Sequence, residues 1–189
     1  YQAIGAYLNE RMVNGQMPRY NMDETRKEAI SLFATLINAG TDEIAWVPST
    51  MVGENCILNG LSLPGTKERV VTDAYHFSGS LYMYNELAKQ GLDLEVIRPR
   101  DNRINYDDLE TAITPGTKLV AISLVSAFNG FQHDLKKVCE IAHAKNALVF
   151  ADIIQAAGAV PIDVKESGVD FCSGATYKWL MGDFGAGFL

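Results

Sequence analysis

The chain has 189 residues, of which 48% are hydrophobic and 21% charged, and its formal net charge at pH 7 is −7. This length is enough for one domain with a substantial core, and this composition is typical of a globular protein. A negative chain without a cluster of Lys and Arg argues against a nucleic-acid-binding surface. No apolar run approaches the ~20 residues that a helix needs to cross a membrane, so we expect a cytoplasmic protein without a membrane partner.

The three cysteines, Cys56, Cys139 and Cys172, are flanked by apolar residues and lack the spacing of a metal site or a redox pair. An odd number without such spacing predicts reduced thiols rather than a disulfide framework. We expect all three to be inert residues of the core.

Residues 1–41 form a predicted N-terminal helical segment. The first five residues already read as helix, and residues 21–39 have the periodicity of one long amphipathic helix. We expect its apolar face to consist of Ala29, Leu32, Phe33, Leu36 and Ile37.

From residue 42 to residue 189, short apolar strands alternate with helices. Strands are predicted at residues 44–47, 69–73, 94–97, 118–123 and 147–151, with a further short strand at Phe171. Helices are predicted at residues 52–61, 78–89, 106–113 and 134–144, the third of them with Asn105 as its N-cap. Continuous apolar strands separated by helices are typical of a mostly parallel sheet covered on both faces. We therefore predict a three-layer α/β domain over residues 42–189.

The last residues, Gly185-Ala-Gly-Phe-Leu189, read as a strand, and the chain begins without Met. A domain is expected to end on a surface loop or a frayed helix. We therefore expect this domain to be incomplete at its C-terminal side and part of a longer chain.

Ligands of open α/β sheets bind beyond the carboxyl ends of the strands. The segments that follow the predicted strands are residues 48–53, 73–77, 126–130, 152–155 and 176–178. Asp152 follows a buried strand, where an unpaired carboxylate is costly and a cationic partner would relieve the cost. A helix N-cap or a structural ion pair would explain this aspartate equally well.

Lys178 lies between Tyr177 and Trp179, among small and apolar residues. Desolvation there would lower the pKa of the lysine and increase the fraction of neutral, nucleophilic amine. The ordinary alternative is a surface lysine whose stem alone is buried.

Residues 49–53, Ser-Thr-Met-Val-Gly, lie between a strand and a helix. Hydroxyls and free N–H groups at a helix N-terminus suit a phosphate, although Ser-Thr is also a common N-cap. A phosphate site, a carboxylate and an amine at one edge of a sheet are what pyridoxal 5′-phosphate (PLP) requires. The carboxylate keeps the pyridine nitrogen protonated, so that the ring can accept the electrons of a carbanion at the substrate's Cα.

From about residue 42 onward, the sequence resembles the class V aminotransferase group of fold-type I PLP enzymes. This group includes cysteine desulfurases, selenocysteine lyases, kynureninase and isopenicillin N epimerase-like proteins. Residues 151–158 resemble the group's Asp-x-x-Gln/His segment, and residues 170–182 resemble the segment with the Schiff-base lysine. Residues 177–180, Tyr-Lys-Trp-Leu, and residues 129–135, Asn-Gly-Phe-Gln-His-Asp-Leu, most resemble the epimerase-like and kynureninase-like branch of the group.

The resemblance implies a role for each candidate site residue. Asp152 would pair with the pyridine nitrogen, Gln155 would hydrogen-bond the ring hydroxyl oxygen, and Lys178 would form the Schiff base. The phosphate would be bound by the residues that follow the first predicted strand and by a tyrosine next to the lysine, namely Thr50, Met51 and Tyr177.

Two positions are ambiguous with respect to the group's pattern. The group places a ring over the cofactor where His76 and Phe77 both occur; the position of the following helix favours His76, and a structural role for this histidine is the alternative. The group's Ser-Asn-x-x-Gly segment reads Ser126-Ala-Phe-Asn-Gly130 here. Asn129 is our candidate, but Ser126 or neither residue can fill the role.

We predict a PLP-dependent enzyme that acts on an amino acid as its small-molecule substrate, with Lys178 and Asp152 as its catalytic residues. The reaction is an aminotransfer, an epimerisation or the cleavage of a Cβ–S or Cβ–Se bond. A catalytically inactive scaffold or regulatory module is one alternative. Another phosphate-binding α/β enzyme is a second, although the sequence has no GxGxxG or Walker loop.

The resemblance also implies a homodimer, and a C-terminal domain beyond residue 189 that supplies an Arg for the substrate carboxylate. Metal binding has no support in the sequence. The three histidines, His76, His133 and His143, lie in separate segments without thiol or carboxylate partners at ligand spacing.

Overall fold

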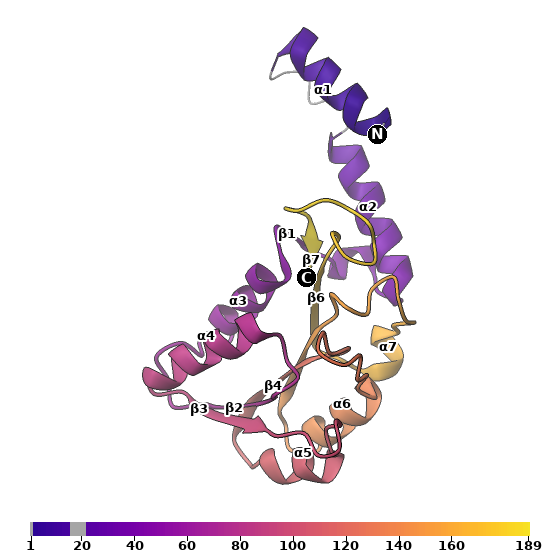
Figure 1. The fold of residues 1–189 in the computed structure, drawn as a ribbon. Coiled ribbons are helices and arrows are strands. Elements are labelled where there is room, and N and C mark those ends of the chain that lie inside the picture. Colours follow the sequence, from indigo (N-terminus) through magenta and orange to yellow (C-terminus); the bar gives the residue numbers. More distant parts are fainter. Residues whose placement is uncertain (1, 16–21) are drawn as a thin grey trace.

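In the part of the chain that the structure describes, seven strands form one sheet, and helices lie on both of its faces (Figure 1). The structure is a computed structural model that describes residues 2–15 and 22–189. The strand order is β1-β7-β6-β5-β4-β2-β3. The bounds are Trp46–Val47 for β1, Arg69–Asp73 for β2, Asp93–Ile97 for β3, Thr117–Ser123 for β4, Leu148–Asp152 for β5, Phe171–Ala175 for β6 and Gly187–Phe188 for β7.

The helices complete a three-layer arrangement (Figure 1). Helices α3 and α4 cover one face of the sheet, and α2, α5, α6 and α7 cover the other. Their bounds are Gln2–Asn14 for α1, Met22–Ile37 for α2, Thr50–Gly60 for α3, Ser78–Lys89 for α4, Tyr106–Ala112 for α5, Leu135–His143 for α6 and Val164–Ser167 for α7, with a 3₁₀ turn at Thr41–Glu43.

Side chains of the buried strands alternate between two apolar clusters. Leu119 and Ala121 of β4 pack in the cluster beneath α3 and α4, whereas Val120 and Ile122 pack in the cluster beneath α2, α5 and α6. Successive residues of a strand point to opposite faces. A sheet covered on both faces therefore needs the continuous apolar runs that the sequence contains.

The carboxyl ends of the strands lie at one edge of the sheet. Strands β4, β5 and β6 are parallel, and their register aligns Ser123 with Asp152 and Asp152 with Ser173. Strand β7 is antiparallel to both β6 and β1. Strands β1 and β6 consequently run in the same direction, and the segments that follow them also start at this edge.

The predicted three-layer α/β fold with a mostly parallel sheet is confirmed. Every predicted strand and helix is present, with bounds that differ by a few residues. Asn105 caps α5, as its side chain accepts a hydrogen bond from Asp107 N–H at 2.9 Å. The sequence analysis did not anticipate the short helix α7 or the 3₁₀ turn, since each spans less than two helical turns.

Two expectations about burial are wrong. Helix α2 buries Phe33, Ala34 and Ile37, but Leu32 and Leu36 are 66% and 44% exposed. Only part of the apolar face of α2 therefore packs on the sheet, and the rest of that face is exposed. Cys56, which was expected in the core, is exposed on α3, while Cys139 is buried and Cys172 half-buried; all three are free thiols.

The helix expected at the start of the chain is α1, whose described part begins at Gln2, and Tyr1 lies outside the described residues. The division of the chain at residue 41 stays a prediction. Within residues 2–15 and 22–189, no helix has the length and apolar character needed to cross a membrane. The same residues contain no cluster of three or more metal-binding side chains.

Gly53 provides a test of how closely α3 packs on the sheet. A Cβ at this position would overlap the Ser173 side chain of β6, whose Cβ would be only 2.9 Å away. We expect Gly53→Ala to lower the free energy of unfolding by about 1–3 kcal/mol, as overpacking does. Gly60→Ala is the matched control on the same helix, since a Cβ there meets nothing within 4 Å. Chemical denaturation that gives equal effects for the two variants would contradict the close contact.

Candidate active site

Helix α3 begins at the carboxyl edge of the sheet, where its first N–H groups are exposed to the cavity side rather than bonded within the helix. Ser49 is the N-cap, and its hydroxyl accepts a hydrogen bond from Val52 N–H at 3.3 Å. The helix itself leaves the N–H groups of Thr50 and Met51 free. Thr50 is 7% exposed, and its hydroxyl oxygen is buried without a hydrogen-bond partner among the described residues. An unpaired buried hydroxyl costs about 1–3 kcal/mol, so this group is suited to a ligand that supplies the missing partner.

Asp152 ends β5 and is 3% exposed. Its Oδ1 accepts a hydrogen bond from Ile154 N–H at 2.9 Å. Burial raises the pKa of Asp152 to about 6, against the opposing effects of the charge on His76 and of the Ile154 N–H. A nearby cation would restore the ionised form of this carboxylate.

Lys178 is exposed, and the expectation that it is buried is wrong. The chain turns back directly after β6, with hydrogen bonds from Met181 N–H to the Lys178 carbonyl and from Gly182 N–H to the Thr176 carbonyl. This turn lies at the surface, which leaves Met181 90% exposed. The lysine nevertheless forms part of the wall of a cavity that Asp152 also lines.

The side chains around Lys178 support one another. Gln155 Oε1 accepts a hydrogen bond from Trp179 Nε1 at 3.0 Å. The ring of Tyr177 stacks on Phe184, with ring centroids 4.4 Å apart. Both Gln155 and Tyr177 line the same cavity as Lys178.

The cavity brings together most of the predicted site residues. Its volume is ≈ 70 Å³, which is the space of about two waters, so a larger ligand requires exposed side chains at the rim to move. It is lined by Ser49, Thr50, Met51, Phe77, Ser123, Val125, Ala127, Asp152, Ile154, Gln155, Tyr177 and Lys178. Larger hollows of ≈ 790 Å³ and ≈ 580 Å³ lie elsewhere on the surface, and neither is lined by a site residue that the sequence predicts.

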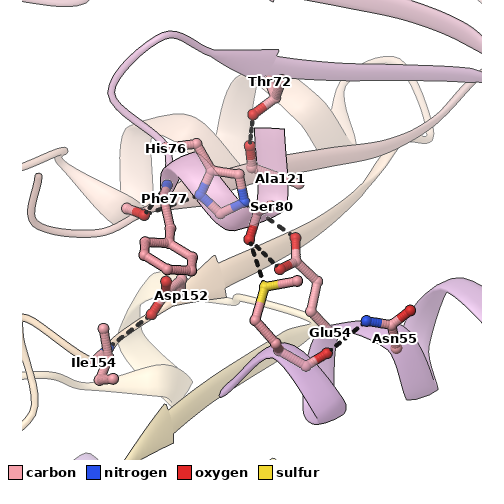
Figure 2. Close-up of polar contacts among 11 residues, drawn as sticks. Glu54, Asn55, Thr72, His76, Phe77, Ser80, Ala121, Asp152 and Ile154 are labelled. Atoms are coloured by element: carbon pink, nitrogen blue, oxygen red, sulfur yellow. Dashed lines mark hydrogen bonds and ion pairs between the residues drawn. The ribbon is translucent and has the colours of Figure 1, made fainter. Parts of the chain in front are cut away.

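His76 does not line the cavity, contrary to the expectation that its ring faces the ligand. Its ring is 0% exposed and is held by Ser123 at Nδ1 and Glu54 at Nε2 (Figure 2). The ring that lines the cavity is that of Phe77, which is 42% exposed. The structural alternative for His76 therefore describes its position.

Asn129 also lies outside the cavity. It is exposed, and its amide donates to the Asn102 carbonyl at 3.0 Å while its Oδ1 accepts from Phe131 N–H. Ser126 is buried, but its hydroxyl accepts from Phe128 N–H inside the same loop and is not part of the cavity wall. Neither of these two alternatives is brought to the cavity.

Two residues of this region were missed by the sequence analysis. Ser123, the last residue of β4, lines the cavity, and a polar residue at the end of a buried strand was a signal that could have found it. Glu54 is 1% exposed on α3 and contacts His76. A glutamate inside an apolar helix gives no sequence signal for a partner 22 residues away.

A family model of the class-V aminotransferases matches residues 2–189. The chain belongs to this family. The match includes all the cavity residues and the helices α1 and α2, and it confirms the resemblance that residues 151–158 and 170–182 indicate.

Relatives in the family differ in their described activities. The uncharacterized aminotransferase YcbU of Bacillus subtilis is 33% identical over 188 residues, which are 100% of this chain and 50% of YcbU. The kynureninase of Pseudomonas fluorescens is 30% identical over 192 residues, which are 96% of this chain and 45% of that protein. The apo structure of a cysteine desulfurase from Thermococcus onnurineus NA1 matches with a TM-score of 0.74 and 27% identity, over 86% of this chain and 41% of that one.

The chain spans about half the length of the curated relatives that it matches. Its fold is that of the large, PLP-binding domain of this family.

The raised pKa of Asp152 gives a testable dependence of stability on pH. Because the folded pKa of about 6 lies above the unfolded value of 3.8, the protein binds more protons folded than unfolded between these values, and stability falls as the pH rises through this window. Asp152→Asn should remove this loss and raise the free energy of unfolding of the cofactor-free protein at pH 8 by on the order of 3 kcal/mol.

The measurement is chemical denaturation at a series of pH values between 4 and 8. Asp73→Asn is the matched control, since Asp73 is equally buried at the end of β2 but is paired with His133 at 3.1 Å. This control should destabilise the protein, by about 1 kcal/mol or more. A fall in stability for Asp152→Asn at pH 8 would show that the Asp152 carboxylate is already compensated.

Proposed function

We propose that this chain forms the cofactor-binding part of a PLP-dependent enzyme that acts on an amino acid. The observation that carries the proposal is the buried, unpartnered Thr50 hydroxyl at the start of α3, in one cavity with Asp152 and Lys178. An anion site, a carboxylate and an amine are the three groups that PLP needs from its protein.

The residues of the cavity fit the cofactor by their chemistry. Thr50, Met51 and Tyr177 would hold the phosphate with two hydroxyls and the free N–H groups of α3. Asp152 would face the ring nitrogen, and Gln155 would donate an amide N–H to the ring hydroxyl oxygen while its Oε1 keeps the bond from Trp179. Phe77, whose ring lines the cavity, would take the place that the sequence assigned to His76, as the ring over the cofactor.

PLP, when bound, supplies an electron sink for a carbanion at the substrate's Cα. Asp152 contributes by holding a negative charge next to a ring nitrogen, and the cation in turn lowers the pKa of the Asp152 carboxyl. Lys178 would be the residue that holds the cofactor covalently, and its Nζ would accept a proton from the substrate's Cα or return one.

The class of reaction is the second part of the proposal. The names of the relatives include an aminotransferase, a kynureninase and a cysteine desulfurase, and all three act at or beyond Cα of an amino acid. The whole protein would therefore catalyse an aminotransfer, an epimerisation or a Cβ–S or Cβ–Se cleavage. The substrate carboxylate would be bound by residues other than those that the structure describes.

We also propose that the protein acts as a homodimer in the cytoplasm. Large apolar side chains in the segments that follow β2, β4 and β6 are exposed and are suited to an interface. They are Phe77 (42% exposed), Phe128 (66%), Trp179 (56%), Met181 (90%) and Phe184 (79%).

The attachment of the cofactor to Lys178 can be tested directly. The full-length protein incubated with PLP should develop an absorption band in the near-visible, and borohydride followed by peptide mass spectrometry should find the cofactor on Lys178. Lys178→Ala should abolish the labelled peptide, whereas Lys165→Ala, which removes another exposed lysine, should retain it. A wild-type protein without the band would favour an inactive scaffold.

The phosphate site predicts opposite effects of Thr50→Val on binding and stability. Loss of the hydroxyl should weaken PLP binding about 10-fold or more, while removal of an unpaired buried hydroxyl should leave the cofactor-free protein equally or more stable. The readouts are a fluorescence titration with PLP and thermal unfolding.

Thr72→Val is the matched control. The Thr72 hydroxyl is also buried, but it donates to the Ala121 carbonyl at 2.6 Å. This variant should therefore lose stability and keep its affinity for PLP. Equal PLP affinity in Thr50→Val and the wild type would remove Thr50 from the phosphate site.

A further inference from the structure

A buried ion pair lies directly behind the cavity wall (Figure 2). Glu54 of α3 and His76 of the segment after β2 are 1% and 0% exposed, and Glu54 Oε1 lies 3.1 Å from His76 Nε2. The other carboxylate oxygen accepts a hydrogen bond from the Ser80 hydroxyl of α4 at 2.5 Å. The pair joins three separate segments of the chain at one point.

The hydrogen bonds around the pair account for both oxygens of Glu54. Each oxygen faces a group that can donate, the Ser80 hydroxyl on one side and His76 Nε2 on the other, which suits an ionised carboxylate. A buried carboxylate is costly without a positive partner, and His76 is the group in contact with Glu54 that can carry that charge. The cost of leaving Glu54 unpaired therefore favours both members in their charged form.

Three carboxylates act on His76 from the elements around it. Glu54 approaches from α3, Asp73 from the end of β2 and Asp152 from the end of β5. Burial lowers the pKa of His76, but these three carboxylates outweigh it and raise the pKa above its ordinary value. For Glu54, burial likewise raises the pKa, and the hydrogen bonds and charge of its partners more than offset this, which lowers it.

On its other side, His76 touches the cavity wall through one residue. Nδ1 lies 2.9 Å from the Ser123 hydroxyl, which also accepts a hydrogen bond from Phe77 N–H at 3.1 Å. When Nδ1 carries a proton and donates it to Ser123, the Ser123 hydrogen is free to point into the cavity. If His76 is neutral and Nδ1 carries no proton, Nδ1 instead accepts a hydrogen bond from the Ser123 hydroxyl, whose hydrogen then points away from the cavity.

The Phe77 ring is fixed from a second direction by Gly79. A Cβ at Gly79 would lie 2.5 Å from Cε1 and 3.1 Å from Cδ1 of the Phe77 ring, so the ring rests directly on the glycine backbone. The backbone of Phe77 is held by Ser123, and its ring by the first turn of α4.

We propose that Glu54 holds His76 as an imidazolium, and that the pair is a positioning unit for the cavity: it fixes Ser123 and Phe77 and supplies the positive charge that keeps Asp152 ionised. Neither residue contacts the cavity itself, so both act through Ser123, Phe77 and Asp152. The part of the inference that concerns the cofactor rests on the proposed function, whereas the charge state of His76 does not.

The charge state of His76 is tested without cofactor. Histidine side-chain resonances of the full-length apoprotein, labelled with ¹⁵N and ¹³C, would be followed by NMR between pH 5 and 9. The His76 signals would be assigned by their loss in His76→Gln. At pH 7.0, where an ordinary histidine is mostly neutral, most of His76 should be doubly protonated. In Glu54→Gln, its proton affinity should fall at least 10-fold.

The consequence for the cavity is tested with PLP. In the full-length protein, the affinity for PLP should fall at low pH, below the pH at which Asp152 becomes protonated. We call this fall the acid limb of the pH profile, and Glu54→Gln should move it to higher pH. The affinity for PLP should therefore fall at least threefold at pH 6.5 and less than this at pH 8.5. His143→Gln is the control, because it breaks another histidine–carboxylate pair, with Asp170, which neither lines the cavity nor is among the groups that act on His76, and it should leave the limb in place.

The outcomes separate this inference from the proposed function. A neutral His76 in the wild type at pH 7.0 would overturn the inference, and this result needs no variant to fold. If Glu54→Gln binds PLP normally and its acid limb stays at the wild-type pH, then only the link to Asp152 is overturned. Absence of PLP binding in the wild type, with His76 protonated, would instead overturn the proposed function.

Discussion

The burial of Asp152 is the constraint on which the arrangement of this edge of the sheet depends. Its carboxylate ends a central strand, is 3% exposed and receives one backbone hydrogen bond. A charge in such a place is unfavourable unless positive groups compensate it. The neighbouring strands place polar residues at the same level because β4, β5 and β6 are parallel and in register.

Compensation comes from two sides that differ in accessibility. His76 lies behind the wall, buried and in contact with Glu54, and its proposed charge would come from this contact and not from a ligand. Lys178 lies at the surface, in the wall of the cavity that also contains the Thr50 hydroxyl, which has no hydrogen-bond partner among the described residues. One of these groups is buried and held by the fold, and the other is accessible to a ligand.

The fold could be predicted from the sequence because the two patterns that define it, apolar strands and amphipathic helices, are local and alternate along the chain. In such a fold the residues after each parallel strand meet at one edge of the sheet. The positions of Asp152, Gln155 and Thr50 followed from this rule. The exposure of Lys178 and the burial of His76 did not follow from it. The first depends on how the chain turns back after β6, in a turn closed by the hydrogen bond from Gly182 N–H to the Thr176 carbonyl. The second depends on a contact with a glutamate from another helix.

The contact between the Phe77 ring and Gly79 limits the order in which these positions can change during evolution. A side chain at position 79 collides with the ring as long as residue 77 is an aromatic residue in this orientation. The glycine can therefore be replaced only after the aromatic residue at position 77 has been replaced or its ring has changed orientation. With a smaller residue at position 77, position 79 can accept other residues. The two positions are expected to vary together among descendants of this sequence.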